Sequence, residues 1–115
     1  MDKISLTALA RQQLAAAHRS ESGRAAHTVY GGHQHTLWQT LVALTAGTAL
    51  ADHESPGEAT LQVLQGRVEL TAPNTSWDGT PGDHLVIPAS RHGLHAIEDA
   101  VVLLTVAKAV RQGPT

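Results

Sequence analysis

Two stretches of the sequence decide the fold: residues 53–66 read HESPGEATLQVLQG, and residues 81–92 read PGDHLVIPASRH. Each stretch combines an apolar, strand-like segment with glycine and proline turn residues. Each also carries a histidine at its border, His53 in the first and His92 in the second. Together they predict a small β-barrel in which both imidazoles point into one cavity.

The composition predicts one narrow hydrophobic core. The chain has 115 residues, which is enough for one domain and too few for two. Hydrophobic residues make up 42% of it, and the aromatic residues are Tyr30, Trp38 and Trp77, with no Phe. The core must therefore be filled by small branched aliphatic side chains, which suits a small barrel.

The charge pattern argues against nucleic acid and membrane partners. The net charge is -2, with 8 basic and 10 acidic residues spread along the chain and no basic cluster. The longest apolar run, Val101 to Val106, is far too short to span a membrane. The N-terminal residues form no contiguous apolar signal region, so we expect a cytoplasmic protein.

Several chemistries have no residues to support them, whereas histidine is abundant. The chain has no cysteine, which excludes disulfides, thiolate metal sites and cysteine nucleophiles. It contains no Gly-x-Ser-x-Gly elbow and no phosphate loop or Rossmann glycine pattern, so we expect no nucleotide cofactor. Histidine is the usual neutral ligand of transition metals. The eight histidines are His18, His27, His33, His35, His53, His84, His92 and His95.

Residues 1–115 are predicted to form a single domain with a helix, a barrel and a tail. Leucine and alanine residues at helical spacing predict a helix over residues 5–18, packed outside the barrel. Short apolar segments separated by Gly and Pro turns predict an all-β, antiparallel barrel over residues 25–107. The tail over residues 111–115 is expected to be flexible.

The strands of this barrel can be placed in outline. Residues 36–45 are apolar on both faces, which indicates a strand covered on two sides. Gln65-Gly66 predicts a two-residue hairpin between strands over residues 59–64 and 67–71. Successive turns are predicted at Pro73-Asn74, Asp78-Gly79 and Pro81-Gly82. The other expected strands cover residues 25–30, 48–52, 84–87, 93–97 and 101–107.

The two stretches resemble the two sequence motifs of the cupin superfamily. The matching positions are Gly47, His53 and Gly66 in the first motif and Gly82, Asp83, Pro88 and His92 in the second. The resemblance covers roughly residues 36 to 107. It implies a cupin-type barrel, also described as a double-stranded β-helix or jelly roll, in a small single-domain cupin.

The metal ligands that the resemblance implies are only half present. The family pattern has a second histidine where this chain has Ser55, and a glutamate where it has Ala59. Of the four implied ligand positions, His53 and His92 remain. Protein metal sites typically supply three or four ligands, so two histidines would hold an ion weakly. The motif is therefore degenerate, and a divalent transition metal (Fe, Mn, Ni or Zn) is optional.

Other side chains are candidates to refill the site. Gln62 and Gln39 each interrupt an apolar strand, so they either lie in the cavity as neutral ligands or face solvent. His35 could supply a ligand if its strand neighbours that of His53. Glu58 is one residue from the vacant glutamate position, but strand alternation turns it the other way. The candidate metal ligands are His53 and His92, with help from Gln62 or His35, and the candidate pocket residues are Gln62, Gln39, His53 and His92.

Two functions are consistent with these residues, and we favour the first. In the first, the protein is a small-molecule binding or sensing module whose cavity is lined by His53, Gln62 and His92. In the second, it is a metal-dependent cupin enzyme of dioxygenase or isomerase type, which needs at least three convergent ligands and an open coordination position. No catalytic residue is indicated. Because a small barrel exposes sheet surface, we also expect a homodimer, formed through a sheet face or the helix.

Overall fold

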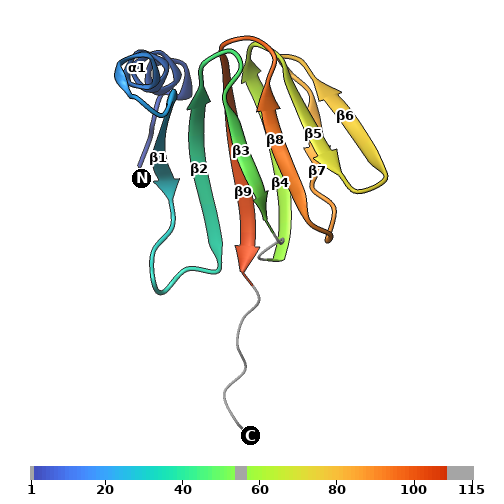
Figure 1. Ribbon diagram of the computed structural model, residues 1–115. Helices are drawn as coiled ribbons and strands as arrows, with labels where there is room; N and C mark the ends of the chain where they lie inside the picture. The colour runs from blue at the N-terminus through green and yellow to red at the C-terminus, as the bar shows by residue number, and fades with distance from the viewer. Residues whose placement is uncertain (1, 54–56, 109–115) are drawn as a thin grey trace, which may run out of the picture.

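The computed structural model describes residues 2–53 and 57–108, so the predicted tail over residues 111–115 lies outside the described part of the chain. Over these described residues, helix α1 is followed by strands β1 to β9 (Figure 1). Their bounds are α1 Leu6–Arg19, β1 Arg24–Tyr30, β2 Leu37–Leu44, β3 Ala49–His53, β4 Gly57–Gln65, β5 Val68–Ala72, β6 Thr75–Gly79, β7 His84–Val86, β8 His92–Ala96 and β9 Ala100–Lys108.

The strands form two antiparallel sheets that face each other, as the predicted all-β barrel requires. The five-stranded sheet has the order β1-β2-β9-β4-β7, and the four-stranded sheet has the order β3-β8-β5-β6. β3 and β9 end, and β4 and β8 begin, at the lower end of the barrel in Figure 1. This end, called the lower end below, therefore gathers residues from both sequence motifs.

The helix begins at a capped residue and covers the outer face of the larger sheet. The Ser5 side chain accepts a hydrogen bond from the Ala8 N–H at 3.2 Å, which satisfies one of the unpaired donors of the first turn. Leu9 of the helix belongs to a buried cluster with Leu41 and Val101 of the sheet. The prediction of a helix outside the barrel is confirmed.

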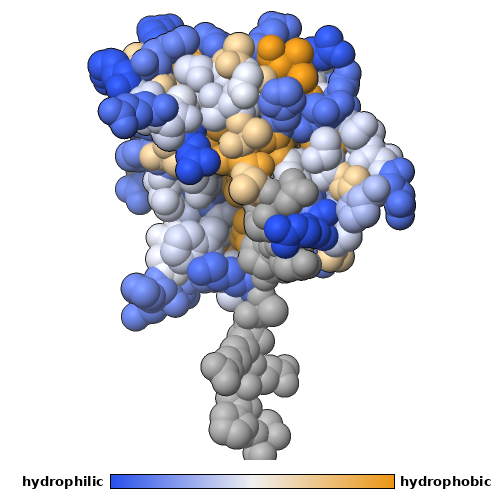
Figure 2. All heavy atoms as spheres, viewed as in Figure 1, coloured by the Kyte–Doolittle hydropathy of each residue, from blue (hydrophilic) through white to orange (hydrophobic). Residues whose placement is uncertain are grey.

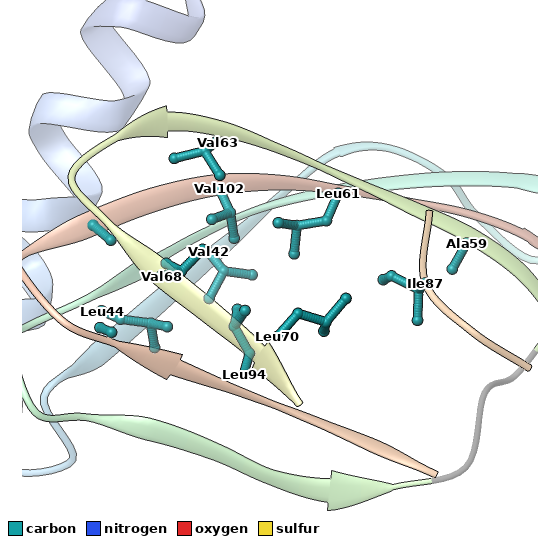
Figure 3. Packing of buried hydrophobic residues seen from close by; sticks show 12 residues of the cluster. Val42, Leu44, Ala59, Leu61, Val63, Val68, Leu70, Ile87, Leu94 and Val102 are labelled. Atoms are coloured by element: carbon teal, nitrogen blue, oxygen red, sulfur yellow. The ribbon is translucent and has the colours of Figure 1, made fainter. Parts of the chain in front are cut away.

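A second cluster fills the space between the sheets with aliphatic side chains. Figure 3 shows Leu61 and Val102 of the larger sheet facing Leu70 and Leu94 of the smaller one. The largest fully buried side chains are all leucine and valine, as the scarcity of aromatic residues predicted. They are Leu41, Leu44, Leu70, Val63, Val68, Val101 and Val102.

The second half of β2, from Leu41 to Leu44, is buried on both faces, which confirms the prediction of a doubly covered strand for this part of residues 36–45. Val42 and Leu44 belong to the cluster between the sheets, whereas Leu41 and Ala43 belong to the cluster under the helix. Since alternate residues of a strand point to opposite faces, the two clusters define the inner and the outer face of this strand. The same alternation determines which polar side chains of the other strands point into the barrel.

The predicted hairpin at Gln65-Gly66 is wrong. β4 pairs with β7 and β9, and β5 pairs with β6 and β8, so the chain crosses here from one sheet to the other. Gly66 has φ +73°, and a Cβ atom at this position would collide with the carbonyl oxygen of Asp99. Glycine is therefore needed here because the backbone passes close to the β8–β9 connection. The dipeptide Gln65-Gly66 is equally compatible with a hairpin, so the sequence does not distinguish the two roles.

The strand β6 was not predicted, because the sequence indicates a turn on each side of it and another within it. The predicted turn at Pro73-Asn74 is the connection of a hairpin, because Ala72 and Thr75 are paired residues of β5 and β6. Asp78-Gly79, predicted as a turn, is the end of β6 and pairs with Glu69 and Val68. β6 is an exposed edge strand with four polar or glycine residues among five, so it lacks an apolar pattern.

In the described ranges, no helix combines the length and the apolar character needed to cross a membrane.

Candidate ligand-binding site

His92 is a buried polar residue of the barrel interior. It is 5% exposed and begins β8, two residues before the core residue Leu94. Its Nδ1 lies 3.0 Å from the carbonyl oxygen of Ser90. A carbonyl only accepts hydrogen bonds, so Nδ1 carries the hydrogen and, in the neutral ring, Nε2 carries the lone pair. The ring is therefore oriented by the segment that directly precedes its strand.

The backbone of His53 lies next to that of His92. β3 pairs with β8, and after an irregularity that follows Leu50 the Cα partner of His53 is His92. The two sequence motifs thus meet at neighbouring backbone positions at the lower end of the barrel. The side chain of His53 lies outside the described part of the structure.

A small cavity lies between the sheets next to His92. Its volume is about 40 Å³, which is room for a few water molecules and less than an organic ligand needs. Among the described residues that line it, His92 is the polar one. The others are Val42, Leu50, Leu61, Leu70, Ile87, Leu94, Val102 and Leu104.

A larger hollow adjoins this cavity at the lower end of the barrel. It has a volume of about 420 Å³ and is lined by β4, by the end of β7 and by the segment that follows β7. Its residues are Gly57, Glu58, Ala59, Thr60, Val86, Ile87 and Ala89. Ile87 lines both the hollow and the inner cavity, so the hollow and the space beside His92 both adjoin this residue.

A second depression opens on the side of the barrel between β1 and β3. It measures about 350 Å³ and is lined by Ser22, Arg24, Ala25, Ala26, Val42 and Leu50. Figure 2 shows apolar atoms in the middle of this face, framed by polar ones. Val42 and Leu50 also line the inner cavity, so the core approaches the surface here.

The two glutamines predicted for the pocket lie on the outer face of the barrel. Gln62 is exposed, while its neighbours Leu61 and Val63 are buried in the core. Gln39 shares its face of β2 with Leu41, which lies under the helix, and donates a hydrogen bond from Nε2 to Thr105 Oγ1 at 3.3 Å. Both predictions of a pocket residue are therefore corrected, because strand alternation turns these amides outward.

His35 does not lie on a strand next to His53. It is an exposed residue of the connection between β1 and β2, and its ring packs edge-on against Tyr30 with centroids 4.8 Å apart. β2 pairs with β1 and β9 in the larger sheet, whereas β3 belongs to the smaller one. The condition under which His35 was expected to supply a ligand is not met.

The described residues do not fit a transition-metal centre of the family type. Ala59 points inward and is 6% exposed, so a methyl group stands where the family has a carboxylate. Glu58, next to it, is exposed on the other face. Over residues 2–53 and 57–108, no group of three or more His, Asp or Glu side chains is arranged to hold an ion. Among the side chains that the structure describes here, the imidazole of His92 points inward, and one ligand falls short of the three that such sites typically supply.

The fold is that of known cupins. No family model and no curated protein matches the sequence. A conserved Streptococcus pyogenes protein of unknown function has 28% identity and a TM-score of 0.71, with 79% of each chain covered. An RmlC-like cupin from Desulfovibrio desulfuricans has 26% identity and a TM-score of 0.64, with 73% of this chain and 81% of that one covered. A cupin superfamily protein from Desulfitobacterium hafniense has 18% identity and a TM-score of 0.69, with 75% and 78% covered.

These likenesses and the two-sheet topology agree with the two sequence motifs. The chain has a cupin-type fold. Its function is a separate question, because a fold of this kind carries many chemistries and the site decides among them.

Proposed function

We propose that this cupin domain binds a small molecule at the lower end of its barrel and does so without a resident metal ion. The observation that carries the proposal is the contact of two spaces at Ile87: a hollow of about 420 Å³ and an inner cavity that holds His92. Ligand pockets in proteins typically measure about 300–1,000 Å³ and combine apolar walls with a few placed polar groups.

The chemistry of the walls describes the ligand that they would accept. Ala59, Ile87 and Ala89 offer apolar contact at the hollow, and the inner cavity is aliphatic apart from His92. The Ser90 carbonyl holds the ring so that Nε2 is its accepting nitrogen. The ligand is therefore a compact molecule with an apolar body.

The alternative, a metal-dependent cupin enzyme of dioxygenase or isomerase type, has less support. It requires at least three convergent ligands and an open position. Ala59 removes the carboxylate, and Gln62 and His35 are both placed away from the interior. Elemental analysis of the purified protein beside a His53→Ala, His92→Ala double variant tests this alternative directly. Stoichiometric metal that is lost in the double variant would favour the enzyme.

Variants that fill the hollow test the proposed binding site. Ala59→Leu and Ala89→Leu each add bulk at its wall, whereas Ala15→Leu adds the same bulk to an exposed position on the remote helix. A library of small organic compounds is first screened against the wild-type chain by NMR of the methyl groups. Compounds that shift Ile87 are then expected to bind both filled variants at least about tenfold more weakly, a loss of about 1.4 kcal/mol, and Ala15→Leu unchanged. Equal affinity for all four chains would reject the site.

The predicted homodimer is retained as part of the proposal, with the side depression as its contact surface. β1 is an edge strand of the larger sheet, and Ala26 and Thr28 on it are exposed. Figure 2 shows apolar atoms on this side. Val42 and Leu50, which line the depression, also line the inner cavity, so the apolar surface here is continuous with the core. Edge strands beside apolar surface are commonly covered by a second copy of the chain.

A further inference from the structure

The Lys108 ammonium group and the Trp38 indole ring contact each other at the lower end of the barrel. The Nζ atom of Lys108 lies 3.8 Å from the ring centroid of Trp38, which is the geometry of a cation–π contact. The Trp38 ring is fixed from two further directions. Its Nε1 donates a hydrogen bond to the His35 carbonyl at 3.2 Å, and Gly31 lies so close that a Cβ atom there would strike the ring.

Trp38 and Lys108 lie on the inner faces of their strands, further toward the lower end than the residues that line the cavity. Val42 of β2 and Leu104 of β9 line the inner cavity. Trp38 lies on the same face of β2 as Val42, and Lys108 lies on the same face of β9 as Leu104, because each pair is an even number of residues apart. The Cα partner of Lys108 on β4 is Gly57, which lines the hollow. The backbone of Lys108 therefore lies at the border of the proposed binding site, and its ammonium group, which contacts Trp38, is carried by a flexible side chain.

The charges around this border differ between the two faces of the sheet. In the part of the chain that the structure describes, the ion pairs are His18–Asp99 and Arg67–Asp78, and neither involves Lys108. The acidic residue of the hollow, Glu58, is exposed and has outer-face parity on β4, opposite to Ala59. The inner side of the border thus presents a cation without a carboxylate partner in that range.

We infer that the ligand of this domain is an anion whose charged group is contacted by Lys108. The inference rests on the proposed function and names the ligand class for the same site. An apolar body would lie against Ala59 and Ile87, and a carboxylate at its outer end would receive a charge-assisted hydrogen bond from the ammonium group. Trp38 holds the lysine in place before the ligand arrives, which reduces the ordering that binding requires.

Matched pairs of carboxylates and primary amides provide the test, from benzoate and benzamide to hexanoate and hexanamide. All measurements use a Trp77→Phe background, so that the fluorescence of Trp38 reports binding, and NMR of the Ile87 methyl groups places it. The better carboxylate is expected to bind about fivefold to tenfold more tightly than its amide at low salt. Added salt should reduce this preference, because the group lies near the surface.

Substitutions assign the preference to the lysine. Lys108→Met is expected to abolish it and Lys108→Arg to retain it, while Lys3→Met, at an exposed position near the N-terminus, leaves it unchanged. Glu58→Gln is expected to leave the affinity for carboxylates equal or higher. Weaker carboxylate binding by Glu58→Gln, or an undiminished preference in Lys108→Met, would overturn the inference.

The same data separate this inference from the proposed function. If carboxylates and amides shift Ile87 with equal affinity, the site stands and the anion preference is wrong. If no member of either series affects Trp38 or Ile87, both the inference and the proposed function are rejected.

Discussion

The imidazole of His92 is tied to the backbone carbonyl of Ser90, two residues earlier in the chain, with Nδ1 and the oxygen 3.0 Å apart. In metalloproteins such a bond fixes the tautomer and orientation of a ligating ring. Here it persists in a barrel whose inward position 59 is an alanine. The orientation of the ring is thus built by the local chain and is available for purposes other than metal binding.

Restoring the missing carboxylate tests the account of the metal site. Ala59→Glu is expected to lower the free energy of unfolding by about 2 kcal/mol or more without metal, because a buried carboxylate loses its hydration. Mn²⁺ or Zn²⁺ should then recover part of the loss in thermal denaturation, since a ligand that binds the folded state stabilises it. Gln62→Glu places the same carboxylate on the exposed face of β4 and serves as the control. Tight stoichiometric binding by the wild-type chain would contradict the account.

Alanine substitutions at two glycines with positive φ distinguish the cost of backbone strain from the cost of a steric collision. Gly66→Ala is expected to cost on the order of 3 kcal/mol, because φ is +73° and the new Cβ would meet the Asp99 carbonyl. Gly47→Ala should cost only about 1–2 kcal/mol, since φ is +85° but nothing lies within 4 Å of the new atom. Urea denaturation measures both. Equal losses would show that the crossing at Gly66 is looser than described.

Asp99 makes folding stability depend on acid pH. Its carboxylate accepts a hydrogen bond from the Ala46 N–H at 2.8 Å and lies 2.7 Å from His18 Nε2. The backbone hydrogen bond chiefly, and the contact with His18, lower the pKa of Asp99 below its ordinary value of 3.8. Because the folded-state pKa is the lower one, this stabilisation is complete above about pH 4 and is lost as the pH falls through the folded value.

Asp99→Asn should therefore flatten the acid limb of the stability curve. The change is expected to be at most about 1 kcal/mol, because the carboxylate is partly exposed and screened by solvent. Asp2→Asn, at an exposed position near the N-terminus, is the matched control. Urea denaturation at a series of pH values compares the three chains, and an acid limb that is the same in all of them would refute the role of Asp99.

The mass of the protein in solution tests the proposed contact between two copies. We expect light scattering to give the mass of a homodimer. Ala26→Glu, which places a charge in the side depression on the edge strand β1, should shift the equilibrium toward the monomer. Ala15→Glu on the exposed side of the helix should not. A single peak at the monomer mass for the wild-type chain would reject the homodimer.

The fold could be predicted from the sequence because its signals agree at several levels. The motif glycines, the strand patterns and the doubly apolar segment over residues 36–45 all indicated the same barrel, and the helix was placed within one residue at each end. The wrong predictions concern short segments whose sequence is compatible with two different structures. Gln65-Gly66 suits a hairpin and a sheet-to-sheet crossing equally well, and an exposed edge strand such as β6 has no apolar pattern.

The site was harder to predict because the sequence does not show which face of β4 and of β2 points into the barrel. Leu64 packs against the helix on the outer face of β4, so residues 61–64 look apolar on both faces and Gln62 seemed buried among them. Gln39 lies on the same face as Leu41, which the helix covers, and the sequence alone does not show where the helix ends over the sheet. The Trp38–Lys108 pair joins residues 70 positions apart and has no local signature.

The central claim is that a ligand occupies the hollow beside Ile87 with its inner end toward His92. The most direct measurement is an isotope-filtered NOE experiment on the complex with the tightest compound from the screen. The account predicts NOEs from the ligand to the Ile87 methyl groups, the Ala59 methyl group and the His92 ring. NOEs confined to the helix side, at Leu9 and Leu41, or to the exposed face around Gln62, would contradict it.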